Sequence, residues 1–395
     1  IRCFIKCFYF FDSNFDYFFK HYYYVIIIDF LYLILLTMAE INDRRQINEF
    51  KGITFSGFKK SAVKKELLNS LIDGKIEQSC YWCGEYICAG HYLDVWEMII
   101  LYCSKYIHLG NPNLPRYLDM RYENFKDIVN DGLNDNELVL RNNIKIRKLF
   151  AEIMCILCLS NKKHQFTSHK VKKTDFETIE LTDKLKANNV EYAKTTFKSD
   201  DPKEFYIALN EFVYHLSETK NVAMCCYWVE WMFEFETLAK KAKKIKFSCQ
   251  IREFAPVEHK FKKDTVWMIW DIFLNLSLKK KGFLPIVKSL LNIFSIRYKS
   301  GSKKKRKFLI YFAISLFTEN TSINNPIYKE SNQETIENIK EKINIIYQQI
   351  KKNELTPKTS YLFNNTICDK TKNLENTIQK LNTLDNITNF IPRKN

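Results

Sequence analysis

The segment IEQSCYWCGEYICAGHYLDVWEMIILYCSKYI, residues 76–107, decides the fold class of this chain. Apolar and aromatic residues fill most of its positions. They predict two buried helices, over residues 76–89 and 93–107, separated by Gly90. Only nine Gly and eight Pro occur in 395 residues. Strands joined by tight turns usually need more of both, so we expect an all-α protein.

Helical periodicity continues on both sides of this segment and divides the chain into two units. Residues 59–71 and 144–159 predict further helices of the first unit, and GNPNLP at residues 110–115 predicts a loop. Asp201 as N-cap, with Pro202 at the first helical position, opens the second unit. Its later helices are predicted at residues 224–238, 266–278, 284–298 and 307–317. The expected organisation is a helical unit over 38–168, a linker over 169–200, a second helical unit over 201–318 and a tail over 319–395.

The first 37 residues are almost all Phe, Tyr, Ile, Leu, Asp, Lys and Cys. One interpretation is a membrane anchor, but Asp29 would be costly in hydrocarbon and the uninterrupted apolar runs are short for a span. The other is translation of sequence upstream of the true start. We favour the second interpretation and expect the native chain to begin at Met38.

The tail over 319–395 is rich in Asn, Thr, Ile and Lys. Within it, isoleucines between Ile336 and Ile350 follow one another at intervals of three and four residues. This spacing predicts either a short coiled coil or one amphipathic helix in a poorly ordered tail.

Three motifs occur twice, in the same order, and predict an internal duplication. CYWCGE at 80–85 matches CYWVEW at 226–231, DVWEMI at 94–99 resembles TVWMIW at 265–270, and RKLF at 147–150 resembles RKFL at 306–309. Chance is the alternative, because Tyr-Trp pairs pack well in any helical core. The aromatic residues that we expect in equivalent core positions are Tyr81, Trp82, Trp96, Tyr227, Trp228 and Trp267.

The first unit also carries a pattern of helix-packing residues. Tyr81-Trp82 lies in a helix, Ala89-Gly90 follows with the Gly eight residues after the Trp, and SKYIHLGNP stands at 104–112. In these features residues 60–166 resemble the helical collar of clamp-loader-like AAA+ ATPases, specifically the replication-associated recombination protein A group. The chain departs from that family at Lys105 and Tyr106, where the family has an acidic pair.

The resemblance implies a helical domain that holds subunits together in a ring and does no chemistry. The sequence contains no G-x-x-x-x-G-K-[ST] motif, so it offers no phosphate-cradling loop of that type for a nucleoside triphosphate. The composition, heavy in Lys, Asn and Ile, resembles that of uncharacterised proteins of large cytoplasmic DNA viruses.

Two cysteine pairs have the spacing of metal half-sites, Cys80 with Cys83 and Cys155 with Cys158. Both pairs fall within apolar helices, where cysteines three residues apart share one face and pack as small hydrophobic side chains. We therefore expect core packing, with zinc as the alternative, and we predict no metal site and no cofactor. His108, at a predicted helix end, is interpreted as a cap. No D-x-D or H-E-x-x-H constellation occurs, so the protein is expected not to be an enzyme.

The formal net charge of +16 favours an acidic partner. Codon bias offers another source for part of the Lys excess. Basic runs fall at predicted helix ends and loops, and they indicate either a solvated face or phosphate contact, with the 303–307 run as a mobile clamp. The residues predicted to contact DNA are Lys162, Lys163, Lys243, Lys244, Lys303, Lys304, Lys305, Arg306 and Lys307.

These observations lead to one functional hypothesis and one alternative. The hypothesis is a non-enzymatic accessory of DNA replication or repair, a collar-like scaffold that assembles with itself or with an AAA+ replication factor. The alternative is a structural virion or core protein that contacts packaged DNA. In both cases the partners include nucleic acid and exclude the membrane. The expected location is intracellular, and for a viral protein the host cytoplasm or the virion.

Overall fold

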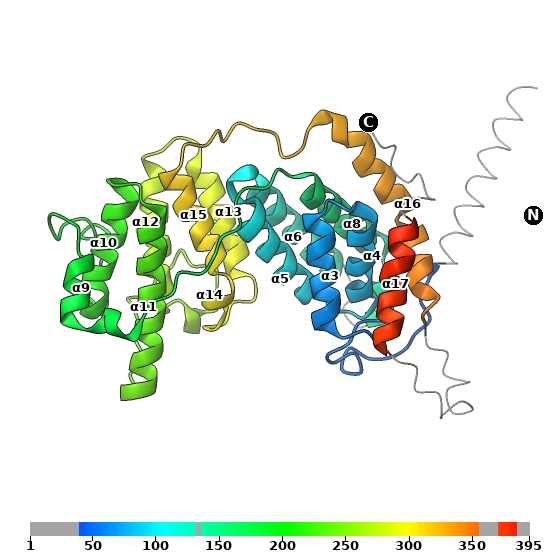
Figure 1. Cartoon of the computed structure of the whole chain (residues 1–395), viewed down its shortest axis with the longest axis horizontal. Helices are drawn as coiled ribbons and strands as arrows, with labels where there is room; N and C mark the ends of the chain where they lie inside the picture. Colours follow the sequence, from blue (N-terminus) through cyan, green and yellow to red (C-terminus); the bar gives the residue numbers. More distant parts are fainter. Residues whose placement is uncertain (1–38, 132–135, 355–369, 385–395) are drawn as a thin grey trace, which may run out of the picture.

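The computed structural model describes residues 39–131, 136–354 and 370–384. The expected start at Met38 lies outside these residues. Helices make up the regular structure of the described ranges, where the only β-type pairing is an isolated bridge between Ile53 and Lys59. The prediction of an all-α fold is confirmed for these ranges. Figure 1 shows two groups of helices side by side along the long axis of the molecule.

The first group holds six α-helices and a tight turn of π- and 3-10-helix between α5 and α6. Its α-helices are α3 (Lys60–Ile72), α4 (Ile76–Cys88), α5 (Tyr92–Tyr102), α6 (Leu114–Asn130), α7 (Glu137–Asn142) and α8 (Ile144–Leu159), and the turn comprises η2 (Cys103–Ile107) and η3 (His108–Gly110). Helix α4 is buried on nearly every side. It packs against α3, α5 and α8, because apolar and aromatic residues surround its axis.

The second group contains seven α-helices. They are α9 (Thr178–Lys184), α10 (Tyr206–Ser217), α11 (Val222–Lys243), α12 (Val266–Leu278), α13 (Phe283–Ser295), α14 (Ser302–Lys305) and α15 (Lys307–Thr318). The side chain of Asn221 caps α11 by accepting from the backbone N–H of Met224 at 3.1 Å. The two groups meet where α6 packs along α13.

Helical structure begins directly after Pro202, as predicted to within a residue, but Asp201 is not its N-cap. A 3-10 turn, η5 (Lys203–Phe205), precedes α10, which begins only at Tyr206. Asp201 is buried and forms an ion pair with the fully buried Arg252 at 2.6 Å, so its carboxylate holds the loop before α12. The carboxylate of Asp201 therefore binds the guanidinium of Arg252 in place of the helix N-terminus that the local sequence favours.

The repeated motifs lie in corresponding helices of the two groups. Trp82 lies in α4 and Trp228 in α11, each the second long helix of its group, while Trp96 and Trp267 lie in the next helices, α5 and α12. Arg147 stands in the first turn of α8, and Arg306 directly precedes α15. The series α3 to α8 and α10 to α15 therefore carry these motifs in the same order. The duplication itself stays a prediction.

The amphipathic helix predicted in the tail is confirmed at residues 333–351, which form α16 (Gln333–Lys351), but it packs on the first group and does not lie in a poorly ordered tail. Helix α16 packs on α4 and α8 of the first group, and its isoleucines at 336, 339, 343, 346 and 350 are buried. A Cβ at Gly84 would lie 2.5 Å from Ile350 Cδ1, so this glycine lets α16 approach α4 closely. A further helix, α17 (Lys370–Leu384), follows.

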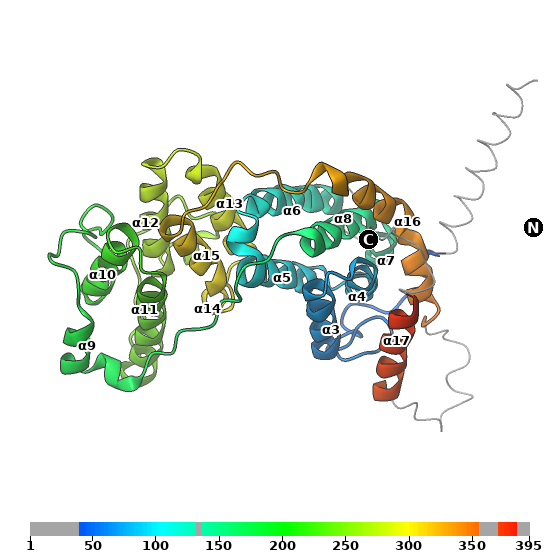
Figure 2. The same ribbon diagram turned by 45° about the horizontal axis from the view of Figure 1, so that its top comes forward.

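Residues 319–332, here called the strap, return the chain from α15 to the first group. Asn111 donates to the carbonyl of Ile327 at 2.7 Å, and Asn113 donates to the carbonyl of Ile323 at 2.7 Å. The strap is visible along one long edge in Figure 2. It brings the last α-helices back beside the first ones, so the core of the first group is built from both ends of the described chain.

Candidate nucleic-acid interface

Residues 160–176, here called the connector, join α8 of the first group to the second group. At its start, the backbone N–H of Lys163 donates to the carbonyl of Tyr106 at 3.0 Å, and that of Phe166 donates to the carbonyl of Lys105 at 3.1 Å. Gly110 permits this contact, because a Cβ there would overlap the carbonyl oxygen of Asn161. The connector is thus fixed to the turn formed by η2 and η3.

His108, in the turn formed by η2 and η3, contacts the start of the connector. Its backbone has a φ of 32°, its ring stacks on Phe166 with centroids 4.3 Å apart, and its Nε2 lies 2.7 Å from the carbonyl oxygen of His164. Burial lowers the pKa of His108 to about 4, so the ring is neutral at physiological pH. This corrects the interpretation of His108 as a charged cap: its role is to stack and to hydrogen-bond.

The middle and the far end of the connector pack on α15 and α11 of the second group. The ring of Phe166 contacts that of Tyr311, with centroids 5.7 Å apart, and Phe176 contacts Trp231 at 5.1 Å. The indole N–H of Trp231 donates to the carbonyl of Asp175 at 3.2 Å. Aromatic residues therefore hold the connector against the second group, while most of the polar side chains between them are exposed and Asp175 is buried.

Lysines are the main charged residues that this fixed connector exposes. Lys162 is exposed, and its amine donates to the carbonyl of Ile72 at 2.8 Å. Four others are exposed without a hydrogen bond or ion pair from their amines to any described residue: Lys163, Lys170, Lys172 and Lys173. These charges have no ion pair to a described carboxylate. One stands where the connector is fixed to the first group and three stand close to where it packs on the second group.

A second set of free lysines stands at the end of α11. Lys244 has a left-handed backbone, with a φ of 54°, and ends the helix. Figure 1 shows α11 reaching past its neighbours at this end. The side chain of Lys243, a predicted contact, lies outside the described part of the structure. The exposed lysines here that lack an ion pair to any described residue are Lys240, Lys241, Lys244 and Lys246.

The 303–307 run differs from the expected mobile clamp, because carboxylates within the protein already neutralise most of it. The amine of Lys303 is buried between Glu236 and Asp264, with the Asp264 oxygen at 2.7 Å. Lys307 pairs with Glu230 at 2.5 Å.

The remaining members of the run vary in exposure. Arg306 is buried, donates to the carbonyls of Phe294 and Ile296 at 2.7 and 2.6 Å, and forms an ion pair with Glu97 of α5. Lys304 is exposed and donates to the hydroxyl of Thr237 at 2.7 Å. Lys305 is exposed without an ion pair to a described residue. This run therefore closes the second group and ties it to the first, and only Lys305 is fully free for phosphate.

The predicted packing residues lie in the cores of both groups. Trp82, Trp96, Trp228 and Trp267 are all buried, as is Tyr81, whereas Tyr227 is half-buried. Trp267 donates its indole N–H to the carbonyl of Phe261 at 2.7 Å. The indole N–H groups of Trp96 and Trp228 have no partner among the described residues. These tryptophans therefore contribute mainly through buried area.

The cysteines of the two predicted half-sites are buried on α4 and α8. Burial, together with the nearby thiols of Cys155, Cys83 and Cys158, raises the pKa of Cys80. Cys158 Sγ lies 3.4 Å from the hydroxyl of Ser79. Within the described ranges, no three His, Cys, Asp or Glu side chains are placed to hold a metal ion. A raised pKa keeps these thiols protonated, which disfavours the thiolate form that metals and electrophiles need.

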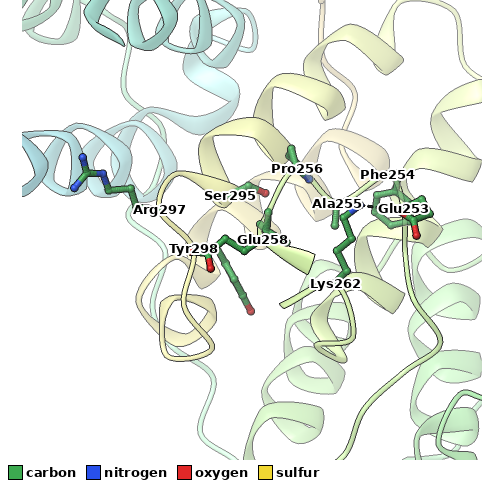
Figure 3. Close-up of a pocket in the computed structure, with 10 residues that line it drawn as sticks. Glu253, Phe254, Ala255, Pro256, Glu258, Lys262, Ser295, Arg297 and Tyr298 are labelled. Carbon is green, nitrogen blue, oxygen red and sulfur yellow. Dashed lines mark hydrogen bonds and ion pairs between the residues drawn. The ribbon is translucent and has the colours of Figure 1, made fainter. Parts of the chain in front are cut away.

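A cavity of about 560 Å³ opens between the loop at 253–258 and the end of α13 (Figure 3). Glu253 and Lys262, on its wall, neutralise each other at 2.6 Å. Figure 3 shows Arg297 directed away from the loop residues. The cavity thus gathers no convergent charge, and we assign no ligand to it.

Comparison of the chain with protein-family models, with curated proteins and with solved structures found no match. Among the described helices, none combines the length and the apolar character needed to cross a bilayer. Sequence patterns could identify the basic runs, but they could not distinguish the free lysines of the connector from the paired ones at 303–307.

Proposed function

We propose that this protein is a non-enzymatic accessory of DNA replication or repair that binds duplex DNA through its connector. The observation that carries the proposal is the row of four unpaired lysines on an anchored backbone, at positions 163, 170, 172 and 173. Lysines that replace counterions on the phosphate backbone provide affinity without sequence preference. An anchored segment loses less conformational entropy on binding than a disordered one.

The scaffold part of the proposal concerns assembly. Helices α6 and α13 pack together, and the ion pair of Arg306 with Glu97 adds a charged link between the two groups. A rigid helical body of this kind suits a collar-like role, in which the protein associates with itself or with an AAA+ replication factor. The helical resemblance of residues 60–166 motivates that choice of partner.

The experiment that tests DNA binding is a salt titration of affinity for a fluorescent duplex of mixed sequence, followed by anisotropy. Replacing Lys163, Lys170, Lys172 and Lys173 by Gln should weaken binding. It should also reduce the slope of log K against log salt by up to about 0.9 for each lysine lost. A duplex of unrelated sequence should give the same result.

The matched control replaces four exposed lysines without ion pairs in and before α3, namely Lys51, Lys59, Lys64 and Lys65, by Gln. It changes the net charge equally. If the two quadruple variants lose the same affinity and slope, net charge rather than the connector governs binding, and the proposed interface is wrong. If the unaltered protein binds no duplex at 50 mM salt, the DNA-binding function is wrong.

A further inference from the structure

The turn between α12 and α13 exposes an apolar side chain among lysines. Residues 278–282, LKKKG, are five consecutive exposed residues, here called the tip, and Leu278 is 69% exposed. The tip lies at an outer edge of the second group in both ribbon views (Figures 1 and 2). All five of its residues are exposed, so they are accessible to a partner.

The conformation of the tip is fixed before any partner binds. Gly282 has a φ of 84°, and a Cβ there would overlap the side chain of Ile323 in the strap. The amine of Lys280 donates to the carbonyl of Phe317 at 3.3 Å and lies over the ring of Phe283, 5.0 Å from its centroid. These contacts direct Lys280 inward and leave Leu278 at the surface.

The charge beside Leu278 is positive, because three consecutive lysines follow it at positions 279–281. Lys279 and Lys281 are exposed without an ion pair to any described residue. Burial lowers the pKa of Lys280, and the nearby charge of Lys220 lowers it further, so a second ammonium group stands close to the tip.

We propose that the tip is a membrane-surface contact that binds anionic lipid headgroups with its lysines and inserts Leu278 at the boundary of the acyl chains. Anionic lipids attract each lysine near the surface, and an apolar side chain adds affinity as it leaves water. A phosphate backbone of DNA offers no complement to an exposed leucine. An exposed turn can contact a flat, deformable membrane surface. A helix of an acidic protein would instead need a groove to bind in.

The sequence alone predicts no membrane partner. The contact proposed here is peripheral, needs no membrane-spanning helix and lies on a different surface from the connector. It does not rest on the proposed DNA binding, because the variant that lacks the four connector lysines keeps the tip intact. That variant should therefore bind vesicles as the unaltered protein does.

The experiment measures co-sedimentation of the full chain with vesicles of phosphatidylcholine alone or with 30% phosphatidylserine, at about 0.15 M salt, where the Debye length is about 8 Å. We expect binding to the anionic vesicles only. Leu278→Ser should lower the partition coefficient about tenfold. Replacing Lys279 and Lys281 together by Gln should lower it about 25-fold, five times for each lysine.

The matched control replaces Lys64 and Lys65 of α3 by Gln, which alters the net charge equally and should leave vesicle binding unchanged. Leu278→Trp should strengthen binding, because Trp favours the membrane interface, and the added tryptophan should shift its emission to the blue with anionic vesicles. Equal binding to both vesicle types, an unchanged partition of Leu278→Ser or no binding at all would each overturn the proposal. Loss of duplex binding in Leu278→Ser would likewise assign the tip to nucleic acid.

Discussion

Replacing Lys303 by Met should destabilise the fold rather than weaken DNA binding. The amine of Lys303 lies between Glu236 and Asp264, and the three side chains are 10, 16 and 10% exposed. Burial alone would lower the pKa of Lys303, but the two carboxylates raise it above its usual value. Removing the cation leaves two nearly buried carboxylates facing each other.

The expected cost is about 3–5 kcal/mol of unfolding free energy, the usual result of removing one partner from a buried ion pair. Equilibrium urea unfolding of both proteins measures it. Restoring charge balance should recover part of the loss, so Lys303→Met combined with Glu236→Gln should be about 1–3 kcal/mol more stable than Lys303→Met alone.

The control is Lys305→Met, two residues away, at an exposed position without an ion pair to a described residue. It should change stability by no more than about 0.5 kcal/mol. At a temperature where Lys303→Met stays folded, its slope of log K against log salt for duplex DNA should equal that of the unaltered protein. A stability change for Lys303→Met as small as that of the control would refute the assignment of this lysine to the core.

Three further predictions concern other parts of the fold. The pKa of His108 is lowered to about 4 in the folded protein. Between that pH and about 6.5, the imidazole of His108 is protonated in the unfolded chain but neutral in the folded one. The free energy of unfolding should therefore fall by about 1–2 kcal/mol from pH 7 to pH 5. His108→Asn should reduce this dependence in urea melts at both pH values. Burial also lowers the pKa of His169 and of His215, which account for the dependence that remains. Trp82→Ala and Trp228→Ala should each cost about 3–5 kcal/mol. Their effects should add within about 0.5 kcal/mol in the double mutant, since α4 and α11 make no extensive contact. Ile343→Asp should release α16 and expose the strap to limited proteolysis.

Each of these three has a clear contrary result. A pH dependence of unchanged size in His108→Asn would assign it to groups other than His108. A strong interaction between the two tryptophan substitutions would mean that the groups share one core. Proteolysis of Ile343→Asp at the unaltered rate would mean that α16 is held by something other than its isoleucines.

Periodicity in the sequence was sufficient to locate most long helices. The apolar repeats at 144–159 and 266–278 predict α8 and α12 with their observed bounds. The sequence does not predict helix α6, because Pro115 in GNPNLP indicates a loop. In the structure this proline stands in the first turn of α6, where a missing N–H costs nothing.

Tertiary contacts determined what sequence alone could not. The isoleucines of α16 have the same spacing as a coiled-coil seam, and only the presence of α4 and α8 beside them decides that they join an existing core. For the candidate interface, a run of five basic residues indicates positive charge. Lys303 is neutralised by residues 67 and 39 positions earlier in the chain, Glu236 and Asp264, a pairing that local sequence does not encode.

The return of the chain along the strap has a consequence for biosynthesis. The second group of helices is inserted between α8 and α16, so the first group is discontinuous in sequence. At about 5–20 residues per second, a ribosome needs roughly 10–40 s to proceed from the end of α8 to the end of α16. During that interval α4 and α8 emerge without their covering helix, whereas the inserted group can close as soon as α15 is made. The emerging first group is therefore the part of the nascent protein that most needs a chaperone.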